Sequence, residues 1–405
     1  MEEGWQHYVR QGGGVLALEI CAFWVFGLQV GCHAVLLADL SRALGLSPGP
    51  LGLALLAGAA SSVVVMSSLG WTADWLGRKA FLLVVVCVSG CGIVGLAVAD
   101  SFATLILVMV VVFPAAGLYD VGINAVAVDL EQATRSRYMP FLHAAYSGGA
   151  VVGALGAGVL LSVGVGYRLI YLLLLVPLAA VAMTFASTQL PPPGGAHGEA
   201  PSEGITDTSA GNGRWDLYRR APLLLVAAIA AFGLLAEGEM ENWSGIYLRH
   251  SVGLPPLSGG FGVTVFYGAM TVGRLATGWV VNRVGNQHTL LAAGLLVAFG
   301  MALALATTAP SLVIVGLLLV GLALAAIVPL ALSVAGDLVP ERAGAAISVV
   351  TTFGYGGFLL GPPLIGGLAA LVGLRAALGV IAFAGFTISI LSMRLRAHEE
   401  KSMTS

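Results

Sequence analysis

The chain consists of long apolar segments separated by short polar connections. Apolar residues sustained over about 20 positions of a helix cross the roughly 30 Å hydrocarbon core of a bilayer. The pattern therefore predicts an all-α membrane protein with twelve transmembrane helices, in two pseudo-symmetric six-helix bundles. We place the spans at residues 14–37, 51–69, 80–99, 102–126, 139–163, 168–187, 221–247, 259–281, 289–308, 311–333, 344–371 and 375–393.

One polar stretch interrupts this pattern near the middle of the chain. It contains the run Pro191-Pro-Pro-Gly-Gly and is rich in Gly, Ser, Thr and acidic residues. Such a composition buries too little apolar surface to fold alone and is typical of a flexible linker. We expect an N-terminal bundle over residues 1–187, a cytoplasmic linker over 188–220 and a C-terminal bundle over 221–405.

The composition excludes several classes of protein. Charged residues make up only 9% of the chain and hydrophobic residues 58%, whereas a soluble domain carries about 25% charged residues. The net charge of -2 argues against a nucleic-acid partner. No P-loop, nucleophile elbow or metal-ligand pair is present, so we expect no enzyme, no cofactor and no metal site. The expected partners are the lipid bilayer, a small-molecule substrate and protons or another ion.

The Lys and Arg residues indicate the orientation of the chain in the membrane. With the N-terminus inside, fourteen of them, Arg274 included, lie at cytoplasmic ends of the spans. Only four, Arg42, Arg168, Arg249 and Arg375, lie on the opposite side. By the positive-inside rule, this bias places both termini and the linker in the cytoplasm. The first span is too long for the apolar part of a signal peptide.

The two predicted bundles share an internal repeat. At an offset of 208 residues, Gly70 aligns with Gly278, Asp74 with Asn282 and Gly77 with Gly285. At an offset of 209, Tyr146-Ser-Gly matches Tyr355-Gly-Gly in the eleventh span. Parallel repeats of this kind relate the two halves of several transporter folds.

The loop after the second span carries the most specific motif, Gly70-x-x-x-Asp74-x-x-Gly77-Arg78-Lys79. Its glycines allow a tight turn and close helix approach. Asp74 can accept hydrogen bonds at a helix start or pair with an arginine across the seam between the halves. Such a contact exists only while the cytoplasmic ends are closed, so these five residues are a candidate gate. Alternatively, Arg78 and Lys79 act only as topology determinants.

This motif resembles the loop signature of the major facilitator superfamily. Further segments resemble its fucose-permease-like branch, which includes a permease associated with rhizopine transport. They are Asp120-Val-Gly-Ile-Asn124, Leu142-His143-Ala-Ala-Tyr146-Ser147, Ala236 to Ser244, Ala269 to Arg274, and Gly354 to Gly366. The resemblance implies a secondary transporter that works by alternating access, commonly as a monomer, in the bacterial inner membrane. It does not supply the substrate.

Two positions depart from the superfamily's patterns. Drug–proton antiporters usually carry Gly-Pro-x-x-Gly-Gly in the fifth span, whereas Gly153-Ala-Leu-Gly156-Ala-Gly158 lacks the proline. This departure weakens the interpretation as a drug exporter. In the second half, Asn282 stands where the first half has Asp74, so we expect the first half alone to provide the acid.

Ionisable residues inside the spans indicate where function is located. They are costly in hydrocarbon and by default face the bundle interior or a water-filled cavity. They are Glu19, His33, Asp120, His143, Glu237 and Glu239. The acids lie only on spans 1, 4 and 7, which line the central cavity in the superfamily. No interior Lys or Arg is expected to neutralise them, so they would be neutral for part of the cycle. We expect Glu237 or Asp120 to carry an exchangeable proton, with Glu19 as a possible relay.

The full set of candidates for the proton-coupling site or substrate cavity contains nine residues. They are Glu19, Asp120, Asn124, His143, Tyr146, Glu237, Asn242, Trp243 and Tyr355. Each has a structural alternative. The acids can be packed and hydrogen-bonded, and the aromatic rings can face lipid. Asp120 can hold the end of its span in place with Asn124 and Arg135 or Arg137.

Three functions are compatible with the sequence. The first is a proton-coupled uptake or exchange permease for a sugar derivative or other small polar metabolite. The second is a drug or metabolite exporter of the same fold. The third is a membrane sensor that does not transport, which would normally add a folded cytoplasmic domain that neither the linker nor the short tail after Arg396 resembles.

Overall fold

The computed structural model describes residues 2–69, 72–134, 136, 138–190 and 217–404, and these residues form helices and no strand. The α-helices are α1 (Glu2–Ala43), α2 (Pro48–Leu69), α3 (Thr72–Trp75), α4 (Arg78–Val98), α5 (Phe102–Thr134), α6 (Met139–Ser162), α7 (Tyr167–Leu173), α8 (Leu175–Ser187), α10 (Ala221–Ile246), α11 (Pro256–Val284), α12 (Asn286–Ala306), α13 (Pro310–Leu338), α14 (Ala343–Val372), α15 (Leu374–Ala377) and α16 (Gly379–Thr404). A π-helical turn, η1 (Tyr247–Ser251), extends α10, and a 3-10 turn, η2 (Pro340–Arg342), precedes α14.

The apolar segments become helices because each backbone polar group must find its partner within the same segment in lipid. Eleven helical segments of the described chain are long and apolar enough to span a membrane, counting α7 with α8 and α15 with α16 as one each. Helix α11 has the length, 29 residues, but is less apolar and carries Arg274 and Arg283. The predicted all-α membrane fold is confirmed.

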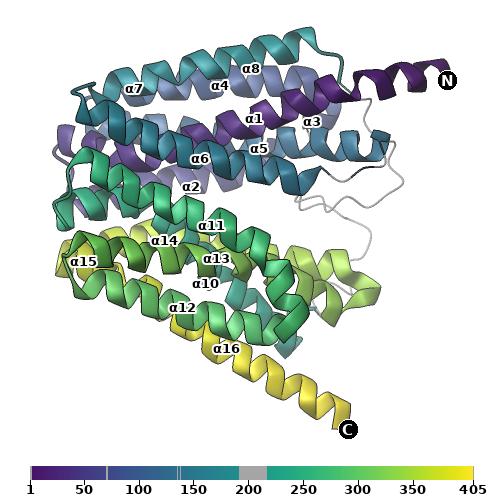
Figure 1. Cartoon of the computed structure of the whole chain (residues 1–405), viewed down its shortest axis with the longest axis vertical. Coiled ribbons are helices and arrows are strands. Elements are labelled where there is room, and N and C mark those ends of the chain that lie inside the picture. Colours follow the sequence, from purple (N-terminus) through teal and green to yellow (C-terminus); the bar gives the residue numbers. More distant parts are fainter. Residues whose placement is uncertain (1, 70–71, 135, 137, 191–216, 405) are drawn as a thin grey trace. The chain divides into compact units, whose positions relative to one another are not determined.

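The chain divides into two compact units. Unit 1 comprises residues 1–44 and 57–204, and unit 2 comprises residues 45–56 and 205–405, so α2 contributes to both. In unit 1, α1 packs along α6, and α4 packs against α5, α7 and α8 (Figure 1). In unit 2, α10 packs along α14 and also contacts α13 and α16, while α12 packs against α13 and α16. The domain bounds expected from the sequence stay a prediction, and residues 191–216 of the linker lie outside the described chain.

The internal repeat recurs in the packing of each unit. A Cβ atom added at Gly149 of α6 would overlap the carbonyl oxygen of Trp24 in α1. A Cβ atom added at Gly357 of α14 would overlap the carbonyl oxygen of Ala231 in α10. The two glycines are 208 residues apart, the offset of the loop motif and one less than the offset of the Tyr146 and Tyr355 segments. Both units thus use a glycine to bring two helix backbones into contact.

Candidate functional site

The end of the loop motif ties the start of α4 to two other helices of unit 1. Gly77 adopts a φ of 78°, which favours glycine, and immediately precedes α4. The Arg78 Nε donates to Asp129 Oδ2 of α5 at 2.9 Å. Lys79 Nζ donates to the carbonyl oxygen of Thr188, which follows α8, at 3.1 Å. Gly70 and the side chain of Asp74 lie outside the described part of the structure, so the gating role stays a prediction.

Asp129 is a partner that the sequence analysis missed. Its side chain is only 5% exposed, and that of Arg78 is 15% exposed. A guanidinium–carboxylate contact at this distance is a charge-assisted hydrogen bond, and its burial makes each member dependent on the other. Asp129 and Glu131 near the end of an apolar segment are the available signal, but sequence spacing shows neither which of them meets Arg78 nor that α4 and α5 meet there.

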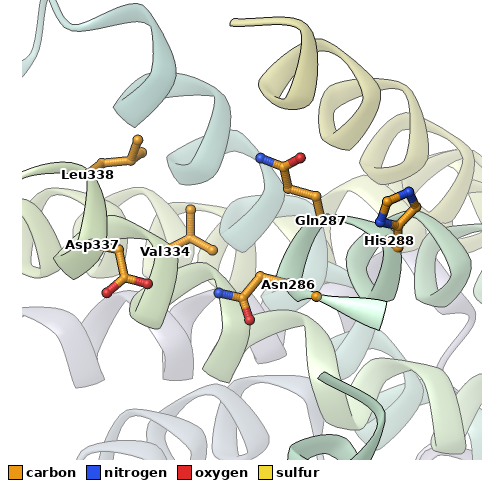
Figure 2. A pocket seen from close by; sticks show the side chains of 7 residues that line it. Asn286, Gln287, His288, Val334, Asp337 and Leu338 are labelled. Atoms are coloured by element: carbon orange, nitrogen blue, oxygen red, sulfur yellow. The ribbon is translucent and has the colours of Figure 1, made fainter. Parts of the chain in front are cut away.

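Unit 2 repeats this corner without the ion pair. Gly285 precedes α12 with a φ of 82°, the equivalent of Gly77. At the same offset of 208, Asp337 corresponds to Asp129, but Asn286 stands where the first half has Arg78. A pocket of about 350 Å³ lies here, with Gln287, His288, Val334 and Leu338 among its lining residues. Figure 2 shows the α12 residues on one side and the α13 residues on the other. Within the described chain, Asp337 has no ion pair.

The two acids of spans 1 and 4 differ in how they are held. Glu19 of α1 is fully buried, and among the described residues neither of its carboxyl oxygens has a hydrogen-bond partner. Tyr119 of α5 is close enough to interact with it electrostatically, although the Tyr119 hydroxyl donates to the carbonyl oxygen of Ala22 at 3.2 Å. Asp120 instead accepts from Asn124 Nδ2, one turn later on α5, at 2.9 Å. Asp120 and Asn124 therefore bond to each other within α5, which continues to Thr134, and not at the end of the helix.

Aromatic residues of α1 bring His143 and Tyr146 of α6 together with Tyr119 of α5. Phe26 contacts both Tyr119 and Tyr146, with ring centroids 5.3 Å and 5.4 Å apart. Phe23 meets the His143 ring edge-on at 5.4 Å. Two of the sequence candidates, His143 and Tyr146, thus both contact aromatic rings of α1. The phenylalanines that connect them were not predicted, because apolar rings in such helices carry no distinctive pattern.

Helices α10 and α11 contain an ion pair that corrects one expectation. Arg274 donates from Nη2 to Glu237 Oε1 at 3.1 Å, and the two side chains are 33% and 17% exposed. The sequence predicts no interior cation, because the positive-inside pattern places Arg274 at the cytoplasmic end of its span. Its place ten residues before the end of α11 puts it beside Glu237 instead. Glu241, one turn after Glu237, interacts electrostatically with both residues.

The other candidates of unit 2 lie apart from this ion pair. Asn242 is buried and donates from Nδ2 to the carbonyl oxygen of Gly238, one turn earlier on α10, at 2.8 Å. Trp243 has no exposed surface, so it packs within the unit. Tyr355 of α14 is 36% exposed. The nine candidates therefore fall into a group in unit 1 and a group in unit 2.

Comparison with known sequences identifies the family. The model described as "Major Facilitator Superfamily" matches residues 20–263 and 242–404. An uncharacterized MFS-type transporter of Yersinia pestis is 30% identical over 369 residues, which are 91% of this chain and 92% of that protein. Membrane protein MosC of Rhizobium meliloti is 26% identical over 378 residues, 93% of this chain and 89% of that protein.

Solved structures show the same fold. The nucleoside transporter NupG matches with a TM-score of 0.76 at 15% identity, and the match covers 95% of this chain and 99% of the NupG D323A chain. A bacterial homolog of the human lysosomal transporter Spinster, inward-facing and unoccupied, matches with a TM-score of 0.71 at 16% identity, covering 95% of each chain. At these identities the likeness concerns the fold alone.

Proposed function

Because the chain belongs to the major facilitator superfamily, we propose that it is a proton-coupled secondary transporter that moves a small polar solute by alternating access. The chain is a multi-pass membrane protein of a transporter family, and this supports transport as its activity. The class of solute, a sugar derivative or similar metabolite, is supported by the segments that resemble the fucose-permease-like branch. We further propose a monomer in the bacterial inner membrane with both termini in the cytoplasm.

The cluster of Glu237, Glu241 and Arg274 carries the proposal of proton coupling. Two acids share one arginine: Glu237 is paired with Arg274 at 3.1 Å, and Glu241 interacts with both. With both acids ionised, the cluster carries one net negative charge in a partly buried place. One proton neutralises that excess, and breaking the ion pair in the other access state would change which acid holds it.

Asp120 and Glu19 are proposed as further coupling groups in unit 1. Asp120 has a hydrogen-bond donor in Asn124, which stabilises its charged form. Glu19 has no donor in the described part of the chain, so its buried carboxyl is suited to hold a proton. The two acids are on helices that pack together, with Tyr119 beside Glu19. A relay between them would pass a proton along the interface of α1 and α5.

Purified protein in proteoliposomes tests this function. A thermal-shift screen against sugars, polyols, amino acids and drugs first identifies a solute that stabilises the folded protein by mass action. An inward-directed proton gradient should then drive accumulation of that solute, and an uncoupler should abolish it. Accumulation that ignores the uncoupler would contradict proton coupling. Transport driven only by proton movement in the opposite direction to the solute would favour the exporter instead.

A further inference from the structure

Glu239 is a buried acid that the proposed coupling cluster does not use. It lies on α10 between Glu237 and Glu241 in sequence, but it has no exposed surface. Neither of its carboxyl oxygens has a hydrogen-bond partner among the described residues. The indole of Trp243, one turn later, interacts with this carboxyl without reaching hydrogen-bond geometry. An ionised carboxylate without a partner is expensive at a buried position, so a counter-charge is missing.

The side chain of Glu239 contacts an unusual turn of α14. A Cβ atom added at Gly361 would overlap Glu239 Oε1, so the carboxyl lies directly against the backbone there. On the preceding turn, the Phe358 ring approaches the Gly238 backbone so closely that a Cβ atom at Gly238 would lie 2.6 Å from the ring. These two contacts place Glu239 over the segment from Phe358 to Gly361.

This turn of α14 lacks two of the backbone N–H donors that a regular helix has. Pro362 and Pro363 both lie inside the helix and supply no backbone N–H. The carbonyl oxygens of Phe358 and Leu359, four residues earlier, therefore lose their helical hydrogen bonds. Carboxylate and backbone carbonyl oxygens are the ligands that hard cations prefer. Backbone carbonyl oxygens that lack a helical donor coordinate sodium ions or protons in several transporter folds, where the helices are unwound, whereas α14 is continuous through both prolines.

Among the described residues, no charged residue of the neighbouring helices forms an ion pair with Glu239. The only titratable residue of α14 is Tyr355, and the only one of α13 is Asp337, one residue before the end of that helix. Helix α16 carries its charged residues only from Arg394 onward. Helix α11 offers Arg274, which is paired with Glu237, besides Tyr267 and Arg283, and η1 adds Tyr247, Arg249 and His250.

We propose that Glu239 and the proline-interrupted turn of α14 form a binding site for a monovalent cation, either a proton or a sodium ion. A bound proton makes Glu239 a donor to one of the freed carbonyl oxygens. A bound sodium ion is coordinated by the carboxylate and those carbonyls together. Both ions satisfy the same oxygen atoms. The inference rests on the proposed function only in giving this ion a part in transport, since binding itself requires no transport.

Thermal unfolding of the purified full-length protein tests the site. Sodium chloride replaces choline chloride at constant ionic strength, and the unfolding midpoint is followed for the wild type, Glu239→Gln and Glu237→Gln. If the site takes sodium, a hundredfold excess of sodium over its dissociation constant shifts the folding equilibrium about a hundredfold. The wild type and Glu237→Gln should show this stabilisation, and Glu239→Gln should not.

A pH series without sodium distinguishes a proton site. As the pH rises past the point at which Glu239 loses its proton, the wild type and Glu237→Gln should lose thermal stability, because a buried negative charge is left without a partner. Glu239→Gln cannot acquire that charge and should lose less stability than the wild type, although Glu19, which is also buried without a hydrogen-bond partner among the described residues, remains ionisable in all variants. Sodium and pH responses that are the same in Glu239→Gln as in the wild type would overturn the proposal.

Proline variants keep the test decisive if Glu239→Gln does not fold. Pro362→Ala and Pro363→Ala restore backbone N–H groups that pair with the carbonyls of Phe358 and Leu359, while Glu239 remains. They should weaken the sodium or proton response.

Pro329→Ala is the matched control, because Pro329 is an exposed proline inside α13 of the same unit. Equal responses in all three variants would contradict the site. A failure of proton-driven transport with these ion responses intact would count against the proposed function alone.

Discussion

Arg78 and Asp129 are 51 residues apart in the chain, and they form an ion pair with 2.9 Å between Nε and Oδ2. The pair links the N-terminal end of α4 to the C-terminal part of α5. At the equivalent place in unit 2, Asn286 and Asp337 face a pocket instead. One bundle thus fixes this corner with a buried ionic contact, and the other leaves it open.

The Arg78–Asp129 pair should contribute measurably to stability. Asp129→Asn removes the buried carboxylate that Arg78 faces, and we expect a loss of about 3 kcal/mol, because removing one member of a buried pair leaves the other without its counter-charge. Asp337→Asn is the matched control, since Asp337 occupies the equivalent position and is exposed. It should change stability by less than about 0.5 kcal/mol. Thermal unfolding of both purified variants measures these changes. Similar losses of stability in the two variants would contradict a specific role for the pair.

Asp74 should act on the balance between access states. Asp74→Asn should leave the protein folded and inserted but shift it toward the cytoplasm-open state and lower the transport rate. A charge-assisted contact near a helix end contributes about 1 kcal/mol, which corresponds to roughly a fivefold change in population. Labelling of single cysteines from the cytoplasmic face measures that balance. If accessibility and transport rate both stay at wild-type values, Asp74 is a topology residue only.

The close contact of α1 and α6 predicts the effects of two neighbouring substitutions. Gly149→Ala should destabilise the protein by about 1–3 kcal/mol, because its new methyl group overlaps the Trp24 carbonyl. Gly148→Ala is next to it on α6 but has open space around its Cβ position. It should be neutral or stabilising by up to about 1 kcal/mol, the helix preference of alanine over glycine. Equal thermal stability of the two variants would show that the helices do not approach as described.

The sequence predicts the elements well because each depends on local composition. The spans follow from apolar length, and the equivalence of Gly77 with Gly285 follows from a repeat that the backbone reproduces with φ values of 78° and 82°. What the sequence does not show is which acid meets which cation. Arg274 was assigned to the cytoplasmic end by its charge, whereas its partner Glu237 lies on another helix.

The same limit separates Glu237 from Glu239. The two acids are two residues apart in sequence and indistinguishable by span or depth. Because successive positions of a helix turn by about 100°, they point to different neighbours. Glu237 meets Arg274 of α11, and Glu239 meets Gly361 of α14. The pairing and burial of these acids therefore depend on tertiary packing, which the pattern of residues in a single sequence does not show.

The predicted orientation is open to direct labelling. In a background without the four native cysteines, single cysteines at Ser202 and Ser405 should react with a membrane-impermeant reagent only after the cells are opened. The reason is the excess of Lys and Arg on the side that carries the termini and the linker. Reaction at either position in intact cells would contradict the predicted orientation.

Two assays on the same proteoliposomes test whether acids inside the spans couple transport to protons. Glu237→Gln and Asp120→Asn should abolish accumulation driven by a proton gradient, because each removes a group that can bind and release a proton. Both variants should retain exchange of solute between equal internal and external pools, which requires no net proton movement. Accumulation at the wild-type level in both variants would contradict the account.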